Sequence, residues 1–222
     1  MLEIIKNKLI VSCQALEDEP LHSSFIMGRM ANAAKEGGAV AIRAQGVDDI
    51  IEIKKVTSLP VIGIIKRNYN DSEIYITPTK KEIDELLESG CEMIALDATN
   101  RKRPNDESLQ DLIYYIKSKG ILVMADISNY EEAITASKLG ADCVSTTLAG
   151  YTSYTESLEG PNLELMKMLV KDLDIPVIAE GKINTPEDLK NAYEMGVYSA
   201  VVGSAITRPQ LITAKFANAI EI

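Results

Sequence analysis

Two stretches near the C-terminus decide the fold of this chain: Ile175-Pro-Val-Ile-Ala-Glu-Gly-Lys-Ile-Asn-Thr-Pro-Glu187 and Gly196-Val-Tyr-Ser-Ala-Val-Val-Gly-Ser-Ala-Ile-Thr-Arg-Pro209. In each, a short apolar run stops at a glycine, and a helix-start signal follows. Consecutive strand–glycine–helix turns are typical of the (β/α)8 barrel, in which the loops after strands 7 and 8 offer free backbone N–H groups to a phosphate. We therefore expect an anchoring site here and the reactive groups on the upstream strands.

The same pattern recurs upstream. The apolar runs of strand length cover residues 9–13, 39–42, 61–65, 93–96, 121–125, 143–145, 177–179 and 200–202. Their nearly continuous apolarity is typical of strands that are covered on both faces. Amphipathic stretches of helical length cover residues 24–35, 47–56, 79–89, 108–119, 129–139, 162–173, 185–195 and 209–220. Eight strands alternating with eight helices predict a single-domain α/β protein, a (β/α)8 barrel over residues 1–222.

Signals at the helix ends support this division. Thr79 and Glu82 have the spacing of a capping box at the start of one helix, which Gly90 closes, and glycines 120, 140 and 196 close three others. An open doubly wound sheet is the main alternative fold. It is less favoured, because no G-x-G-x-x-G turn follows the first strand.

Composition narrows the classes of partner. A formal net charge of −10 argues against nucleic acid or an anionic membrane as a partner, although a local site can still bind an anionic metabolite. The cysteines Cys13, Cys91 and Cys143 are odd in number, far apart and form no C-x-x-C pair, and each lies in or beside an apolar run, which indicates buried apolar residues rather than a reactive thiol. Neither a signal-peptide core nor a membrane-length apolar run is visible. We expect a cytoplasmic, reduced protein.

Polar residues follow the apolar runs directly. In a barrel these positions share one mouth, and a polar group there is costly to bury unless it is paired. The set contains Gln14, Arg43, Lys66, Asp97, Asp126, the triplet Ser145-Thr146-Thr147 and Glu180. Together they predict a polar site at the mouth. Asp97 can equally cap the following helix, so its role stays open.

Other loop residues carry weaker signals. Arg101-Lys-Arg-Pro104 is interpreted as a solvated or interface loop rather than a phosphate clamp. Tyr151 and Tyr154 could fold over a ligand. His22 is the only histidine, so a His-based zinc site cannot be assembled. No H-E-x-x-H, nucleophile elbow or Walker loop occurs either, and we expect chemistry by lysine, carboxylates and polar groups, without metal or cofactor.

The strand-end motifs, taken in order, resemble one known family. They are Ile10-Val-Ser-Cys-Gln-Ala15, Ala41-Ile-Arg-Ala-Gln-Gly46, Gly63-Ile-Ile-Lys-Arg67, Ala95-Leu-Asp-Ala98, Ala125-Asp-Ile-Ser128, Ser145-Thr-Thr147, Ala179-Glu-Gly181 and Val201-Val-Gly-Ser-Ala-Ile-Thr-Arg-Pro209. No single motif is decisive, but the ordered set, from residue 9 to residue 209, resembles the N-acetylmannosamine-6-phosphate 2-epimerase family.

The resemblance implies an isomerase of bacterial amino-sugar and sialic acid catabolism. It would interconvert N-acetylmannosamine 6-phosphate and N-acetylglucosamine 6-phosphate by removing and returning the C2 proton of the ring-opened sugar. Lys66 would be the base, and Glu180 an acid/base for ring opening or proton return. The implied substrate ligands are Gln14, Arg43 and Asp126 for the sugar and N-acetyl groups, and Gly181, Gly203, Ser204 and Arg208 for the phosphate.

The residues give Lys66 a physical case of their own. It follows four apolar residues, with Arg67 beside it and Arg43 on the neighbouring strand. Burial and nearby cations both favour the neutral amine, so the pKa of Lys66 should fall toward the working pH.

Two other functions stay open. One is a class I aldolase or lyase with a Schiff base at Lys66, although such aldolases more often carry the lysine on strand 6, where this chain has Ser145-Thr146. The other is a non-catalytic sugar-phosphate sensor, which would need a partner surface or a basic helix. A homodimer is possible, and the sequence does not identify its interface.

Overall fold

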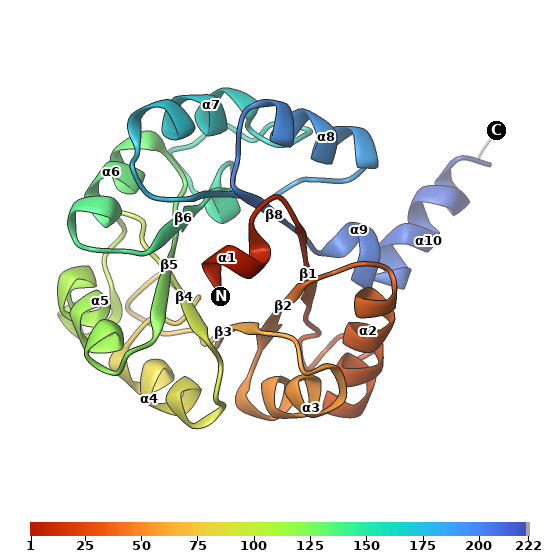
Figure 1. The fold of residues 1–222 in the computed structure, drawn as a ribbon, viewed down its shortest axis with the longest axis horizontal. Helices are drawn as coiled ribbons and strands as arrows, with labels where there is room; N and C mark the ends of the chain where they lie inside the picture. The colour runs from red at the N-terminus through yellow and green to blue at the C-terminus, as the bar shows by residue number, and fades with distance from the viewer. Residues whose placement is uncertain (221–222) are drawn as a thin grey trace.

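The eight strands close on themselves as a parallel barrel, hydrogen-bonded in chain order (Figure 1). The structure is a computed structural model that describes residues 1–220. The strands are β1 (Leu9–Cys13), β2 (Ala41–Gln45), β3 (Val61–Ile64), β4 (Met93–Asp97), β5 (Leu122–Asp126), β6 (Cys143–Ser145), β7 (Val177–Ala179) and β8 (Ser199–Val202). The predicted (β/α)8 barrel is confirmed.

A ring of helices covers the outside of the barrel (Figure 1). Its members are α2 (Ser24–Glu36), α3 (Val47–Thr57), α4 (Lys80–Glu88), α5 (Leu109–Ser118), α6 (Tyr130–Lys138), α7 (Leu163–Asp172) and α8 (Pro186–Glu194). The predicted capping box at Thr79 and Glu82 is present at the start of α4. The four predicted terminal glycines all adopt a positive φ, the left-handed conformation that ends a helix at low cost.

Short elements that the sequence did not predict fill the ends of the barrel. They are α1 (Leu2–Ile5), the 3-10 turns η1 (Pro104–Asp106) and η2 (Thr146–Leu148), and α9 (Ser204–Thr207). α1 lies across the N-terminal opening of the barrel (Figure 1), where Ile5 is fully buried among the interior side chains. The opening at the opposite end, where the strands finish, is the one left for a ligand.

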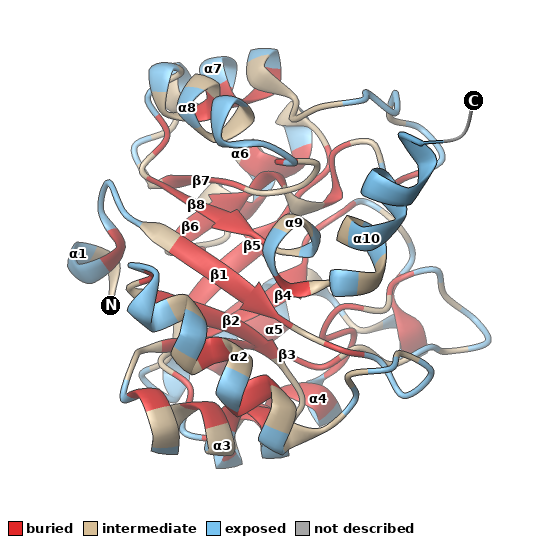
Figure 2. Ribbon diagram, turned by 90° about the vertical axis from the view of Figure 1, so that its right-hand side faces the viewer, coloured by how far each residue is buried: buried red, intermediate tan, exposed pale blue. Residues whose placement is uncertain are grey.

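The core has two layers. One cluster of apolar side chains fills the barrel interior, and a larger one lies between the strands and the helices. Figure 2 shows the strands buried along almost their whole length, while the helices expose their outer faces. Burial on both faces explains why the strand sequences are apolar throughout rather than alternating.

Three strands run further than predicted. β2, β4 and β5 each extend to include a charged residue, namely Arg43, Asp97 and Asp126, whose side chains are no more than 1% exposed. Arg43 and Asp126 pair with each other although they are distant in the sequence, and Asp97 pairs with Arg101 in the following loop. A local hydropathy pattern does not reveal such partners. β3 instead ends one residue early, because a returning segment pairs with the chain from Ile65 onward.

The C-terminal helix leaves the wall of the barrel. α10 (Pro209–Asn218) follows α9 directly and projects outward (Figures 1 and 2). It has no buried residue, and the apolar side chains of Leu211 and Phe216 are exposed. Among residues 1–220, no helix is long and apolar enough to cross a membrane.

Candidate active site

A cavity of about 500 Å³ opens at the C-terminal ends of the strands. All of the predicted site residues except Asp126 line it: Gln14, Arg43, Lys66, Glu180, Gly181, Gly203, Ser204 and Arg208. These residues come from strand ends spread along almost the whole chain. The barrel therefore brings together the set that the strand-end pattern identified.

Arg43 forms the centre of the cavity's charge network. Its Nη1 and Nη2 donate to the two carboxylate oxygens of Asp126 at 2.9 and 2.5 Å, and Nη1 also donates to Oε2 of Glu180 at 2.7 Å. Burial opposes the charge of Arg43, but the two carboxylates raise its pKa. Asp126, fully buried, lies behind Arg43 and also accepts a bond from Thr147 at 2.7 Å. Its predicted contact with substrate stays a prediction.

Glu180 presents one free carboxylate oxygen. Its Oε2 accepts bonds from Arg43, from Ser145 at 3.1 Å and from Thr147 at 3.1 Å. Its Oε1 has no hydrogen-bond partner within residues 1–220, although the side chain is only 12% exposed. Burial raises the pKa of Glu180, and the positive charge of Arg43 acts in the opposite direction. The carboxyl group is thus fixed through one oxygen and available through the other.

Lys66 lies two residues after the end of β3 and has an unpaired amine. Within the described part of the chain, its Nζ forms neither a hydrogen bond nor an ion pair. Its pKa is lowered to about 8, by burial first and then by the charges of Arg43 and Arg208. The predicted direction is confirmed, but the predicted contribution of Arg67 is wrong. Arg67 turns away from the cavity and pairs with Glu82 and with Glu85, the latter at 2.9 Å.

Backbone N–H groups gather on the side of β7 and β8. The N–H groups of Gly181, Gly203 and Ser204 donate to no acceptor in residues 1–220. Gly181 has φ +93°, and a Cβ there would lie 3.3 Å from the carbonyl oxygen of Thr147, so any other residue would be strained at this position. Arg208 borders the same region and is held by Glu19, with Nη2 3.0 Å from Oε2. Free N–H groups beside a guanidinium form a suitable site for a phosphate.

The loop after β6 closes one side of the cavity. Lys182, which the sequence left unassigned, donates from Nζ to Ser157 Oγ at 2.7 Å and to the carbonyl oxygen of Leu158 at 2.6 Å. Its Nζ also lies 5.3 Å from the ring centre of Tyr151, which lines the cavity; that Tyr151 folds over a ligand stays a prediction. Lys182 therefore connects the N–H-rich turn after β7 to this loop.

A second tyrosine of that loop has a structural partner. Tyr154 does not line the cavity; its hydroxyl donates to Oε1 of Glu132 at 2.6 Å. Glu132 is fully buried on α6 and also accepts bonds from the backbone N–H groups of Asn100 and Ser128 and from the Ser128 hydroxyl. One carboxylate thus joins the loops that follow β4, β5 and β6.

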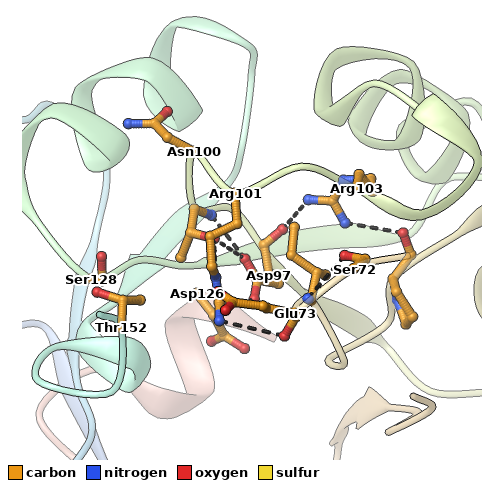
Figure 3. A network of polar contacts seen from close by, with 12 residues as sticks. Ser72, Glu73, Asp97, Asn100, Arg101, Arg103, Asp126, Ser128 and Thr152 are labelled. Carbon is orange, nitrogen blue, oxygen red and sulfur yellow. Dashed lines mark hydrogen bonds and ion pairs between the residues drawn. The ribbon is translucent and has the colours of Figure 1, made fainter. Parts of the chain in front are cut away.

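The loop after β4 also satisfies its own charges (Figure 3). Asp97 accepts bonds from the backbone and hydroxyl of Thr99 and from Nη2 of Arg101 at 2.6 Å. Arg103, 5% exposed, donates to the carbonyl oxygens of Asp97 and, at 3.1 Å, of Pro78. The interpretation of this charge run as a solvated loop is wrong for both arginines, and the alternative of an interface loop stays a prediction. Asp97 does not line the cavity, and its role is internal pairing.

Tyr75 is a cavity residue that the strand-end pattern missed. It lies nine residues after Lys66 in a loop, so no apolar run points to it. The segment that carries it returns antiparallel to the end of β3. A pattern of alternating apolar residues at Ile74 and Ile76 is the only local signal of that return.

The arrangement can bind an anion at one side and move a proton at the other. A half-buried amine with a lowered pKa and a carboxyl group with a free oxygen face a cavity that also holds an N–H-rich turn. Amines and carboxyl groups whose pKa values are shifted toward neutrality are suited to general acid–base catalysis.

Known relatives of the chain share one description. The family model described as "Putative N-acetylmannosamine-6-phosphate epimerase" matches residues 27–222. A "Putative N-acetylmannosamine-6-phosphate 2-epimerase" from Clostridioides difficile (strain 630) is 76% identical over 222 residues, which is the whole of both chains. A relative of the same description from Clostridium perfringens (strain SM101 / Type A) is 68% identical over 218 residues, covering 98% of this chain and 99% of its own.

Solved structures agree with the sequence relatives. The N-acetylmannosamine-6-phosphate 2-epimerase from Clostridium perfringens has a TM-score of 0.98 at 67% identity, covering 99% of this chain and 96% of its own. A thiamine phosphate pyrophosphorylase from Pyrococcus furiosus, with a TM-score of 0.63 at 20% identity over 96% of this chain and 93% of its own, shares the fold alone. The chain belongs to the N-acetylmannosamine-6-phosphate 2-epimerase family.

Proposed function

We propose that the chain interconverts N-acetylmannosamine 6-phosphate and N-acetylglucosamine 6-phosphate by exchanging the proton at C2 of the open-chain sugar. The observation that carries this proposal is the Lys66 amine, which lines the cavity, is half-buried and unpaired within residues 1–220, and is lowered in pKa to about 8. At that pKa about one amine in ten is neutral at pH 7 and about half at pH 8. An appreciable share of the molecules therefore holds a base ready to accept a proton.

The phosphate is the anchor in this proposal. The N–H groups of Gly181, Gly203 and Ser204 would surround its oxygens, and Arg208 would supply a positive charge. Anchoring at β7 and β8 leaves the sugar chain to extend across the mouth toward Lys66 at the end of β3. Binding of the phosphate thereby places the reacting carbon beside the base, although the protein does not contact that carbon directly.

The chemistry begins with ring opening. Glu180 would transfer the proton between the C1 hydroxyl and the ring oxygen through its free Oε1, and C1 becomes an aldehyde. The neutral Lys66 amine then takes the C2 proton, and the electron pair of that C–H bond moves to the aldehyde oxygen as an enolate. The positive charge of Arg43 and the amide of Gln14 would stabilise that oxygen. Return of a proton to the opposite face of C2 inverts the centre.

Isotope exchange at C2 tests the proposal. Wild-type protein in D2O should incorporate deuterium at C2 of either amino-sugar phosphate and produce the epimer, as followed by NMR. Lys66→Ala should lose at least about 10²-fold in rate, the contribution expected of a positioned base. Lys190, an exposed lysine on α8, gives the matched control Lys190→Ala, which should retain the wild-type rate.

Other outcomes identify the rivals. If Lys66→Ala exchanges the C2 proton at the wild-type rate, Lys66 is not the base. A covalent adduct trapped by borohydride with substrate would replace the epimerase by a Schiff-base aldolase or lyase at Lys66. Tight binding of both sugar phosphates by the wild type, without exchange, would indicate a sensor.

We further propose that the protein works as a cytoplasmic homodimer. The exposed Leu211 and Phe216 of α10 supply apolar surface for a second copy, and light scattering that finds a monomer would contradict the dimer. Cys13, Cys91 and Cys143 are buried and free, which fits a reducing compartment. The net charge of −10 argues against nucleic acid as a partner and is compatible with a small anionic metabolite, because the local site can be positive on an acidic protein.

A further inference from the structure

Tyr75 is held beside the proposed base by a short antiparallel pairing. The backbone N–H of Arg67 donates to the carbonyl oxygen of Tyr75 at 3.0 Å, and Lys66 forms a bridge with Ile76. On the other side, the N–H of Asp97 donates to the carbonyl oxygen of Ile76 at 3.0 Å. The segment that carries Tyr75 is therefore fixed between the ends of β3 and β4. The position of the phenol is determined by the barrel rather than by a free loop.

The hydroxyl of Tyr75 has no partner in the described protein. Tyr75 lines the cavity, its ring packs on the apolar cluster of the barrel interior, and its hydroxyl forms no hydrogen bond within residues 1–220. Tyr75 is half-buried, and a tyrosine hydroxyl that is withdrawn from water usually finds a hydrogen-bond partner. Burial, and then the carboxylates of Asp126 and Asp97, raise the pKa of Tyr75, so the hydroxyl keeps its proton and can donate. Its partner is to be sought in the cavity.

The position of Tyr75 selects one end of the substrate. In a closed barrel of eight strands in chain order, β3 lies across from β7. A phosphate held at β7 and β8 places the other end of the sugar toward β3. The proposed proton transfer also requires C2 to reach Lys66, which is adjacent to Tyr75 in the pairing. The end of the sugar that carries C1, C2 and the substituent on C2 is therefore nearest to this phenol.

An apolar floor lies next to the phenol. Ile64, Ile76 and Leu148 border the cavity, belong to the same interior cluster as Tyr75, and are at most 3% exposed. The cavity also presents polar and charged groups, Arg43 among them. An acetamido group combines a methyl, which prefers an apolar surface, with a carbonyl oxygen that accepts one hydrogen bond. The apolar floor suits the methyl group, and the Tyr75 hydroxyl can donate the hydrogen bond to the carbonyl oxygen.

We propose that Tyr75 is a substrate-binding residue that donates its hydroxyl to the carbonyl oxygen of the 2-acetamido group, whose methyl rests on Ile64, Ile76 and Leu148. The proposal rests on the epimerase function and extends it. It assigns to this residue the preference for a 2-acetamido sugar over the corresponding free amine. Because the floor is closed, it also predicts little room for a longer acyl chain.

Binding measured without turnover tests the proposal. In a Lys66→Ala background, calorimetry compares N-acetylglucosamine 6-phosphate with glucosamine 6-phosphate, which lacks the acetyl group. Adding Tyr75→Phe should weaken the binding of N-acetylglucosamine 6-phosphate roughly five- to tenfold, which is the effect of one lost hydrogen bond. The binding of glucosamine 6-phosphate should weaken by no more than about twofold. Tyr114→Phe is the matched control, because that tyrosine is 75% exposed on α5, and it should change neither affinity.

Each other outcome overturns the assignment. Equal weakening of both ligands would show that Tyr75 contacts a group they share, such as the C1 oxygen. Unchanged affinity for both would show that its hydroxyl makes no substrate contact. Failure of the epimerase function is a separate result, since it would appear as missing C2 exchange in the wild type and would leave the ratio of the two affinities unaffected.

Discussion

The mouth of the barrel has two halves that look alike in sequence and differ in structure. On the side of β4 to β6, Asp97, Arg101, Arg103 and Glu132 donate to or accept from other protein groups (Figure 3). On the side of β3, β7 and β8, the Lys66 amine, one oxygen of Glu180 and a row of backbone N–H groups have no partner within residues 1–220. Both halves carry charged residues directly after apolar strands.

This difference in hydrogen bonding distinguishes the residues that hold the loops in place from those that can bind a substrate. A buried polar group is costly unless it is hydrogen-bonded, so native proteins satisfy nearly all of them. Groups that line a cavity without a protein partner are the ones a ligand can satisfy. The first half therefore holds the loops in place, and the second is available for substrate.

The largest expected effect comes from breaking the satisfied half. Asp97→Ala leaves Arg101 and the Thr99 hydroxyl without their buried partner, and we expect a loss of about 3 kcal/mol in the free energy of unfolding. Urea denaturation measures it. Catalytic rate in the folded variant should stay within about twofold, because Asp97 does not line the cavity.

An exposed aspartate provides the control for this loss. Asp174→Ala, on the surface, should change the unfolding free energy by no more than about 0.5 kcal/mol. A stable Asp97→Ala variant with a strongly reduced rate would place Asp97 in the site and remove the distinction between the halves.

The next effect comes from the unsatisfied half. Glu180→Gln keeps the side-chain shape and its contacts with Ser145 and Thr147 but can no longer carry a proton, so kcat should fall on the order of 10²-fold. NMR of C2 exchange measures the rate, and Glu187→Gln, an exposed change on α8, should leave it unchanged. An unaltered kcat in Glu180→Gln would mean that ring opening does not need this carboxyl group.

The smallest expected effect is a pH dependence of kcat/KM that follows the protonation of Lys66. A base must be neutral to accept a proton, and a pKa lowered to about 8 means that the neutral fraction grows as pH rises toward 8 and levels off above it. Between pH 7 and pH 9, kcat/KM should increase by up to about tenfold. A flat profile over this range would contradict the lowered pKa.

The fold was almost fully predictable from local patterns. Buried parallel strands leave continuous apolar runs, and glycines such as Gly90 and Gly120 mark helix ends because they alone adopt a left-handed conformation cheaply. The strand ends were misjudged at Arg43 and Asp126. These two charges pair across the barrel, 83 residues apart in sequence, and no local rule anticipates such a partner.

The site was predictable in its members and less so in their surroundings. Strand-end polarity identified Lys66 and Glu180, because the barrel fold itself fixes which residues face the mouth. The sequence suggested that Arg67 lowers the pKa of Lys66, whereas Arg208 does so in the structure. Adjacency in sequence does not tell which way a side chain turns. Strand-end polarity missed Tyr75, whose place depends on how a loop returns on itself.

The carboxylate of Glu132 limits how freely this scaffold can be re-engineered. Barrel enzymes diversify by varying one strand-to-helix loop at a time. Here a single α6 side chain receives donors from Asn100, Ser128 and Tyr154, which belong to three successive loops. Grafting a foreign sequence into any one of them would leave the other two with an altered acceptor. For purposes of loop exchange, the three act as one inseparable module.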